Sequence, residues 1–314
     1  MTGSSPAPAP TNIMAKKTTP EPSALGQKPV HWICRHRCLP VGDDPLIMGI
    51  LNVTPDSFSD GGMYTNPEKA VAQAQRMTQE GADIIDIGGE STRPGAAPVS
   101  AEAQINRVIP VIEGILTSLP NAVISIDTTS ATVAQKAIAA GACIINDISG
   151  LSCDPAMPEL ARSTKAGIVI MHMQGTPQNM QNNPHYQDCV AEIGQWLQQR
   201  IASLVAIGLD RRAIVADPGI GFGKKIRHNL EILDRLAHFT SLHVPIVVGA
   251  SRKRFIGMVG QAESPQDRLP GSLAALTCAV LKGASILRVH DVQASVQAAR
   301  VAAAIRKPAR WQDV

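Results

Sequence analysis

Aromatic residues and long apolar segments are both scarce in this sequence of 314 residues. Phe, Trp and Tyr together make up 3% of it, so we expect a core built from Ala, Ile, Val and Leu. No apolar run approaches the ~18 residues that a membrane-spanning helix needs. The first 30 residues also lack the apolar centre of a secretory signal. The sequence therefore predicts no membrane partner and a reduced, cytoplasmic location.

An excess of charge of either sign is also lacking. The chain has 29 Lys and Arg against 26 Asp and Glu, a formal net charge of +3, and the two signs are mixed along it. Proteins that bind nucleic acids or anionic membranes usually gather basic residues into a patch. No nucleic-acid partner is therefore expected.

The six cysteines are scattered and form no zinc motif. Cys34 and Cys38 have no second pair of ligands at the spacing of a zinc site. Cys143 and Cys278 lie in apolar runs, which predicts that they behave as small buried hydrophobic residues.

The chain divides unevenly into a tail and one large domain. Residues 1–40 are predicted to be a Pro- and Ala-rich tail and lead-in, largely disordered, because their first 29 residues cannot bury enough apolar surface. A shortage of acidic residues leaves an organellar transit peptide open, although no arginine precedes Arg35. Residues 41–309 form the predicted domain, and residues 310–314 form a short C-terminal tail.

Eight short apolar runs recur at a regular spacing through this domain. They are continuous and rich in β-branched residues, as expected of strands buried on both faces. The runs are 46-LIMGILNV, 82-ADIIDIGG, 122-AVISIDT, 143-CIINDI, 167-GIVIMHM, 213-AIVADPG, 245-PIVVGAS and 286-ILRVHDV. With helical segments between them, eight units predict an α/β fold, a single (β/α)8 TIM barrel. A doubly wound open sheet is the alternative, but the sequence has no glycine-rich dinucleotide fingerprint.

Capping signals mark several of the predicted helices. Asn66 followed by Pro67 predicts one helix start. Ser264-Pro265 with Asp267 predicts another, in the form of a capping box. The last helix carries a single apolar stripe made of Val292, Val296, Ala299 and Ala303.

The end of each predicted strand carries polar residues. These are Asn52, Asp86 with Glu90, Asp127, Asn146-Asp147, His172, Asp217, Ser251-Arg252-Lys253, and Arg288 with His290-Asp291. Any one of them has an ordinary explanation as a cap, a turn former or a hydrogen-bonded structural residue. Because the catalytic groups of a barrel lie at the C-terminal ends of its strands, the whole set predicts a site at one rim.

The rim combines acceptors with cations. Asp127, Asn146 and Asp217 offer acceptors suited to a flat ring with N–H donors along one edge. Positive charge for a phosphate or diphosphate comes from Arg93, Lys253, Arg288 and His290. A heteroaromatic ring with a phosphorylated arm fits this combination, and a nucleotide or a phosphosugar fits it as well.

Seven segments together resemble the dihydropteroate synthase family, the folate-pathway enzymes inhibited by sulfonamides. They are 48-MGILNVTPDSFSDGG, 86-DIGGESTRPG, 125-SIDTT, 144-IINDISG, 217-DPGIGFGK, 249-GASRKRF and 287-LRVHDV, and the match runs in order from about residue 46 to 306. The resemblance implies a transferase that joins (7,8-dihydropterin-6-yl)methyl diphosphate (the pterin diphosphate) to 4-aminobenzoate. The products would be 7,8-dihydropteroate and diphosphate.

The resemblance also implies roles for individual residues. The pterin-binding positions are Asp127, Asn146, Met171, Asp217, Lys253 and Arg288. The diphosphate-binding positions are Asn52, Thr92, Arg288 and His290, and Asn52 also meets Mg²⁺, the implied cofactor. The aminobenzoate-binding positions are Phe58, Arg93, Pro94, Gly221, Phe222 and Arg254. The catalytic positions are Asp60, Arg93, Lys253, Arg288 and His290.

Arg254 departs from the pattern, since many relatives have a serine there. An arginine at this position could bind the aminobenzoate carboxylate or point to solvent. The resemblance further implies a homodimer through the late helices, including residues 265–283.

The first loop is longer than a simple turn needs, which predicts a lid. Diphosphate is a good leaving group next to an electron-rich ring, so its departure can precede attack, and water must then be kept from the cation. Residues 54–62 would close with the loop 91–95 over the reacting carbon, and Asp60 would meet Arg93. An ordinary surface connection is the alternative.

Two other functions remain open from the residues. Pterin-binding methyltransferase domains that pass a methyl group to a corrinoid share the ring-binding acids, but they should lack the full TPDSF and SRK segments. A non-catalytic pterin or folate carrier is the second alternative, and the full set of polar residues counts against it.

Overall fold

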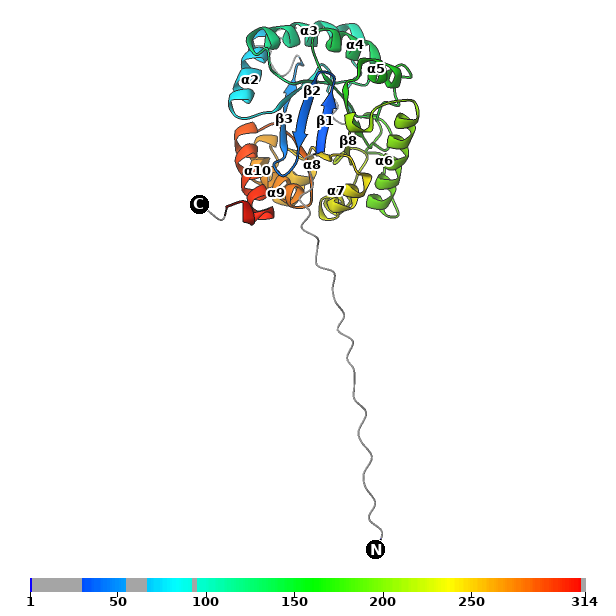
Figure 1. The fold of residues 1–314 in the computed structure, drawn as a ribbon, viewed down its shortest axis with the longest axis vertical. Helices are drawn as coiled ribbons and strands as arrows, with labels where there is room; N and C mark the ends of the chain where they lie inside the picture. Colours follow the sequence, from blue (N-terminus) through cyan, green and yellow to red (C-terminus); the bar gives the residue numbers. More distant parts are fainter. Residues whose placement is uncertain (2–29, 55–66, 92–94, 312–314) are drawn as a thin grey trace.

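Eight parallel strands form a ring at the centre of the molecule (Figure 1). The computed structural model describes residue 1 and residues 30–54, 67–91 and 95–311. Hydrogen bonds join the strands in the order β8-β7-β6-β5-β4-β3-β10-β9, and a parallel bridge between Ala216 and Ile246 brings β8 against β9. The strands are β3 (Leu46–Asn52), β4 (Ile84–Gly88), β5 (Ile124–Asp127), β6 (Ile144–Asp147), β7 (Gly167–Met171), β8 (Ile214–Asp217), β9 (Val247–Val248) and β10 (Ile286–Val289). The predicted TIM barrel is confirmed, and the open sheet is wrong.

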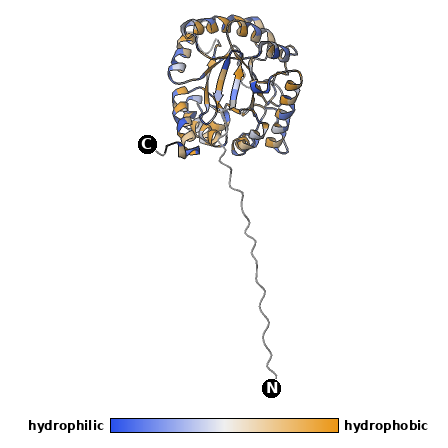
Figure 2. Ribbon diagram, viewed as in Figure 1, coloured by the Kyte–Doolittle hydropathy of each residue, from blue (hydrophilic) through white to orange (hydrophobic). Residues whose placement is uncertain are grey.

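Helices surround the ring and cover its outer surface. They are α2 (Pro67–Gln79), α3 (Ala101–Ser118), α4 (Ala131–Ala139), α5 (Met157–Thr164), α6 (Cys189–Ala206), α7 (Ile226–Asp234), α8 (Arg254–Gly260), α9 (Leu269–Leu281) and α10 (Val292–Arg306). Short 3-10 helices are η1 (Arg211–Ala213), η2 (Leu236–Leu242), η3 (Pro265–Arg268) and η4 (Pro308–Trp311). Figure 2 shows apolar and polar residues alternating along the outer helices. Within the described ranges, no helix is both long and apolar enough to cross a membrane.

The helix signals in the sequence have different outcomes. Pro67 is the first described residue of α2, and because Asn66 lies outside the described residues, the helix start at Asn66-Pro67 stays a prediction. The four residues of the predicted stripe on α10 are all buried. The capping box at Ser264 is wrong. Its hydroxyl lies 2.6 Å from Oε1 of Gln266 and makes no capping hydrogen bond, because residues 265–268 form the 3-10 helix η3 before α9 begins.

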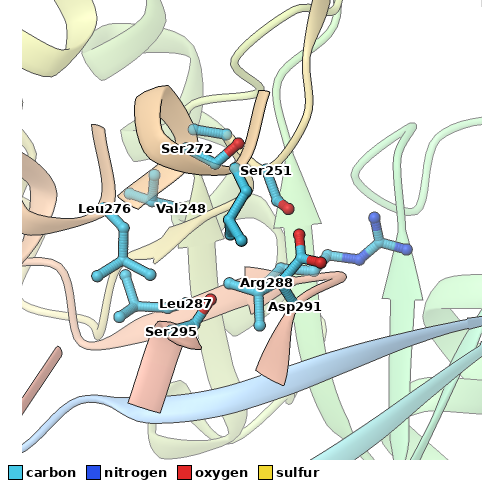
Figure 3. Close-up of a pocket in the computed structure, with 11 residues that line it drawn as sticks. Val248, Ser251, Ser272, Leu276, Leu287, Arg288, Asp291 and Ser295 are labelled. Carbon is cyan, nitrogen blue, oxygen red and sulfur yellow. The ribbon is translucent and has the colours of Figure 1, made fainter. Parts of the chain in front are cut away.

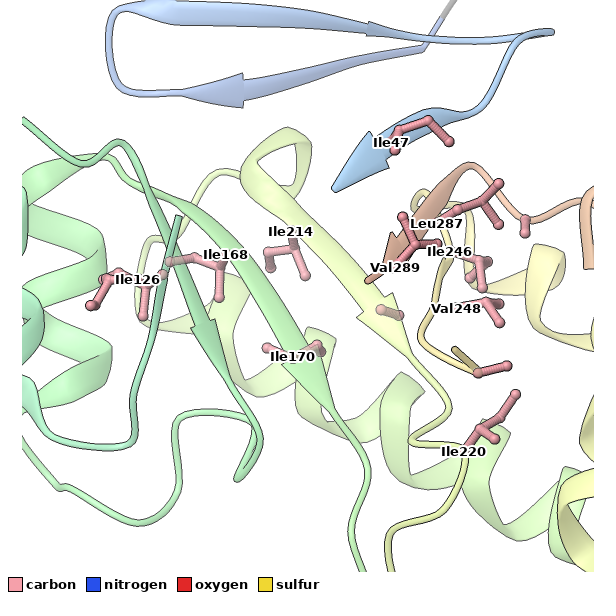
Figure 4. Packing of buried hydrophobic residues seen from close by; sticks show 14 of the residues in the cluster. Ile47, Ile126, Ile168, Ile170, Ile214, Ile220, Ile246, Val248, Leu287 and Val289 are labelled. Atoms are coloured by element: carbon pink, nitrogen blue, oxygen red, sulfur yellow. The ribbon is translucent and has the colours of Figure 1, made fainter. Parts of the chain in front are cut away.

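An aliphatic layer fills the space between the strands and the helices. Ile168 and Ile214, paired across β7 and β8, are fully buried in it, and Ile47 and Leu287, paired across β3 and β10, belong to the same layer (Figure 4). Cys143 is buried as predicted and Cys278 is partly exposed; all six cysteines are free thiols.

A β-hairpin closes the N-terminal end of the barrel. Its strands are β1 (Val30–Cys34) and β2 (Arg37–Val41), paired antiparallel. Trp32 is fully buried, and its Nε1 donates to the carbonyl oxygen of Ala213 at 2.8 Å. The sequence does not predict this hairpin, which begins inside the segment 1–40 that is expected to be a largely disordered tail and lead-in, and ends at Val41. Residues 2–29 lie outside the described part of the chain.

Candidate active site

The alternation of side chains along each strand separates an inner face from an outer face. One residue of most strands packs with Trp32 of the hairpin and so lies inside the barrel: Met48, Ile84, Ile144, Val169, Val215 and Ile286, with Val123, just before β5, packed against the same cluster. Residues an even number of positions further along the same strands also point inward. This inner set includes the strand-end residues Asn52, Asp86, Asp127, Asn146, Met171, Asp217, Arg288 and His290. The predicted pterin residues on β5, β6, β7, β8 and β10 therefore converge on one mouth.

Asp86 and Arg288 form the centre of a buried polar network. Nε of Arg288 lies 2.6 Å from Oδ2 of Asp86, and its Nη2 lies 2.6 Å from Oδ2 of Asp127. Asp86 is completely buried and Asp127 is 8% exposed. The guanidinium is thus held across the barrel by two carboxylates, a geometry that fixes its plane.

The same network sets the orientation of Asn146. Its Nδ2 donates to Oδ2 of Asp86 at 3.0 Å. With the amide nitrogen used in this way, the amide oxygen of Asn146 is left as an acceptor for a ligand. The sequence marks Asp86 as a polar strand end and gives it no further role. Its position two residues after Ile84 places both side chains on the same face of the strand, which would have predicted that Asp86 points inward.

Asp217 and Lys253 lie on the other side of the mouth. Oδ1 of Asp217 accepts a hydrogen bond from the Gly219 amide at 2.7 Å, and Nζ of Lys253 donates to the carbonyl oxygen of Ile220. The same Nζ lies 4.5 Å from the centre of the Phe222 ring, a cation–π distance.

Gly221 leaves the room that Lys253 needs. Its φ is +85°, and a Cβ built on it would lie 2.9 Å from Cδ of Lys253. The structure thus brings Gly221 and Phe222, predicted to bind 4-aminobenzoate, next to Lys253, predicted to bind the pterin, and these roles stay predictions.

Burial shifts the ionisation of these groups toward neutrality. It raises the pKa of Asp127 to about 7, against the opposing effect of Arg288, and it raises the pKa of Asp217, against Lys253. It lowers the pKa of Lys253 to about 8, against Asp217. Strongly shifted pKa values are common in binding and catalytic sites, where a bound ligand supplies hydrogen-bond and charge partners that the protein alone lacks.

His290 and Asn52 stand at the edge of the same mouth. Nδ1 of His290 lies 3.1 Å from Oγ of Ser251, which also accepts from the His290 amide at 3.2 Å. Oδ1 of Asn52 and Oδ2 of Asp127 both border Gly88, each 3.8 Å from the place that a Cβ there would occupy. The diphosphate positions predicted within the described residues therefore adjoin the pterin positions.

A small cavity lies behind β9 and β10, next to α9 and α10 (Figure 3). Leu276, Leu287 and Ser295 line it, together with Arg288 and the polar strand-end residues Ser251 and Asp291. Its guanidinium extends away from these side chains in Figure 3, toward the carboxylates inside the barrel. This cavity therefore lies behind the candidate active site and shares Arg288 and Ser251 with it.

Two polar strand ends have structural roles instead. Asp147 is fully buried on the outward face and accepts from the amide and hydroxyl of Ser149, both at 2.7 Å. His172 is 7% exposed and contacts Lys224. Both lie one position from an inward residue, which explains why they are not part of the mouth.

The remaining predicted residues are only partly placed. Met171 is buried, and its Cγ lies 3.2 Å from where a Cβ of Gly219 would stand. Arg254 is the exposed first residue of α8, and its contact with 4-aminobenzoate stays a prediction. Outside the described residues are Phe58, Asp60, Thr92, Arg93 and Pro94.

Comparison with known proteins gives one consistent result. The family described as "Pterin binding enzyme" matches residues 48–290. Dihydropteroate synthase of Escherichia coli (strain K12) is 47% identical over 257 residues, which are 82% of this chain and 90% of that protein.

Solved structures agree with this. Xanthomonas albilineans dihydropteroate synthase with 4-aminobenzoic acid superposes with a TM-score of 0.83 at 44% identity, covering 89% of this chain and 99% of that one. The same enzyme in complex with 7,8-dihydropteroate gives a TM-score of 0.80 at 42% identity, covering 88% and 99%.

Proposed function

The chain belongs to the dihydropteroate synthase family, a family of transferases in folate biosynthesis, and from that premise we propose how its site performs the reaction. The substrates are (7,8-dihydropterin-6-yl)methyl diphosphate and 4-aminobenzoate, and the products are 7,8-dihydropteroate and diphosphate. The observation that carries the proposal is the convergence of Asp127, Asn146, Asp217, Lys253 and Arg288 at one mouth.

The pterin ring binds to the acceptors on the inner face. The amide oxygen of Asn146 and the carboxylates of Asp127 and Asp217 accept hydrogen bonds from the ring N–H groups. Lys253 donates to the ring carbonyl oxygen. These carboxylates also place negative charge around the ring, where positive charge develops during the reaction.

Diphosphate departs before the amine attacks. The carbon–oxygen bond breaks with its electron pair leaving on diphosphate, and the resulting cation is delocalised into the dihydropterin. The nitrogen lone pair of 4-aminobenzoate then forms the carbon–nitrogen bond, and the amine loses a proton. Arg288 and His290 stabilise the leaving oxygens, so the protein supplies charge and position rather than a nucleophile.

Mg²⁺ fits the donors next to Asn52. The Asn52 amide oxygen and an Asp127 oxygen both border Gly88, and hard oxygen ligands are those that Mg²⁺ prefers. Among the described residues there is no group of three or more His, Cys, Asp or Glu that could hold a metal by itself. Asn52 would therefore hold the ion together with substrate oxygens, where it would neutralise charge on the leaving diphosphate.

A homodimer in the cytoplasm completes the proposal. Large apolar side chains are exposed on the late helices: Met258, Val259, Leu281, Val301 and Ile305. Apolar side chains gathered into one exposed patch are typical of an interaction site, and this is the arrangement that the proposed dimer requires. Sedimentation of the purified protein should give twice the mass of one chain, and a purely monomeric species would contradict the dimer.

A diphosphate-release assay tests the function. The protein with the pterin diphosphate, Mg²⁺ and 4-aminobenzoate should release diphosphate and form dihydropteroate, whereas omission of 4-aminobenzoate should stop dihydropteroate formation. A pterin carrier would bind the ring and release nothing, and a methyltransferase domain would not use 4-aminobenzoate. Lys253→Met should lose most of the activity, because it removes the donor next to Asp217 and Phe222.

A further inference from the structure

A buried lysine contacts the backbone of the segment Gly221-Phe222, which is predicted to bind 4-aminobenzoate and is called the Phe222 wall below. Lys224 is 3% exposed, and its Nζ lies 2.9 Å from the carbonyl oxygen of Phe222. It also lies 3.2 Å from the carbonyl oxygen of His172 and 3.2 Å from Nδ1 of the same residue. An ammonium group has three N–H donors and no acceptor. These three acceptors therefore match it fully when Nδ1 of His172 carries no proton.

The ionisation of His172 agrees with this arrangement, and that of Lys224 depends on pH. Burial, with a further contribution from Lys224, lowers the pKa of His172 to about 3, so the imidazole is neutral. Burial lowers the pKa of Lys224 to about 7, and Asp217 opposes the shift. A neutral His172 that accepts at Nδ1 carries its proton on Nε2. Below about pH 7, where Lys224 is mainly protonated, the pair is one cation held by three acceptors.

The loop that contains this lysine lies with its backbone directly on the end of β7. A Cβ on Gly219 would stand 1.9 Å from the carbonyl oxygen of His172, and one on Gly223 would stand 2.5 Å from that of Gln174. Both glycines have positive φ, +69° and +60°. Only glycine fits at these two positions. The Lys224 side chain adds a hydrogen bond from the same loop to the His172 carbonyl oxygen at the end of β7.

Other anchors hold the same loop from its sides. The hydroxyl of Tyr186 donates to the carbonyl oxygen of Gly223 at 2.9 Å. The amide of Gly221 donates to Oδ1 of Asn229 at 2.7 Å, and Nε2 of Gln181 donates to the Gly221 carbonyl at 2.9 Å. Lys224 differs from these anchors because it holds the Phe222 carbonyl itself.

We propose that Lys224 is a positioning residue for 4-aminobenzoate, because its buried ammonium fixes the Phe222 wall against the end of β7. The inference rests on the proposed function, which assigns Gly221 and Phe222 to that substrate. A methionine would fill a similar volume without the cost of burying an ammonium. The lysine therefore contributes its three hydrogen bonds, and their loss lets the wall move.

Lys224→Met tests the proposal against Lys225→Met as a matched control. Lys225 is the next residue and is exposed, so the control removes the same charge from the same loop without touching the three acceptors. In Lys224→Met we expect the KM for 4-aminobenzoate to rise about tenfold, as for loss of hydrogen bonds from a charged donor, and the KM for the pterin diphosphate to rise by less than about threefold. In Lys225→Met both values should stay at the wild-type level.

Tyr186→Phe decides the question if Lys224→Met does not fold. It removes only the hydrogen bond to Gly223, and it should raise the KM for 4-aminobenzoate selectively, by about threefold. Equal increases in both KM values, or a fall in kcat alone, would overturn the positioning role. Wild-type protein that forms no dihydropteroate would instead overturn the proposed function, so the two failures are distinguishable.

Discussion

Nε of Arg288 lies 2.6 Å from the buried carboxylate of Asp86, although the two residues are 202 positions apart in the chain. The same carboxylate oxygen accepts a hydrogen bond from Asn146. Asp86 therefore holds two predicted pterin-binding side chains in place without needing to contact the pterin. Its second oxygen has no hydrogen-bond partner among the described residues.

Asp86→Ala should weaken pterin binding at least about tenfold, because the Asn146 amide and Arg288 lose the acceptor that orients them. Titration calorimetry with the pterin diphosphate measures this. Ser125→Ala is the matched control: Ser125 pairs with Asp86 across β4 and β5, and its buried Oγ also has no described partner. The control should bind like the wild type, and equal losses in the two variants would show that Asp86 has no special role.

Pterin affinity should be highest between about pH 7 and pH 8. Below the raised pKa of Asp127, about 7, the carboxyl group gains a proton and accepts ring N–H groups less well. Above the lowered pKa of Lys253, about 8, the ammonium loses its charge and donates less well. The dissociation constant should therefore rise on both sides of this window.

Single substitutions show which residue causes the loss of pterin affinity at low pH and which causes the loss at high pH. Asp127→Asn should remove the fall in affinity toward low pH, and Lys253→Met should remove the fall toward high pH. Calorimetry from pH 5.5 to 9.5 measures both losses. An affinity that does not change with pH in the wild type would contradict the assignment.

The strand ends show how far the sequence predicts the site. Asp127 and Asp217 lie at one rim, because eight buried strands in one direction bring their C-terminal ends together, and their contacts with the pterin stay predictions. The polar strand ends Asp147 and His172 are also predicted to belong to the rim site, but their side chains lie on the outer face of the barrel. Counting positions from an inward residue would have separated the two groups, since neighbouring residues on a strand point to opposite faces.

Long-range contacts set the limit of such predictions. The pairing of Asp86 with Arg288 depends on which strands face each other across the barrel, and that of Lys224 with His172 depends on a loop packed on a strand end. Likewise, nothing near Trp32 predicts that its indole reaches Ala213, 181 positions away. Local periodicity contains no information on these partners.

Trp32 should contribute strongly to stability. Its fully buried ring packs inside the N-terminal end of the barrel, so Trp32→Ala should lower the free energy of unfolding by ~3–5 kcal/mol. His31→Ala, on the exposed face of the same strand, should change it by less than ~0.5 kcal/mol. Urea denaturation compares the two variants. Equal effects would mean that the hairpin does not seal the barrel.

Gly221 and Gly208 separate the effect of a side chain at the active site from that of backbone strain. Both have positive φ, +85° and +94°, so alanine at either position should cost about 1 kcal/mol of stability.

Only at Gly221 does the added Cβ press on the Lys253 side chain, 2.9 Å from its Cδ; at Gly208 the nearest atom is Cδ of Arg162, at 3.4 Å. We therefore expect Gly221→Ala to lower kcat/KM at least about tenfold, whereas Gly208→Ala keeps wild-type kinetics. Steady-state rates and urea denaturation of both variants decide the matter. If Gly221→Ala lost stability but kept its rate, Lys253 would tolerate displacement, and the close fit between these two residues would have no part in catalysis.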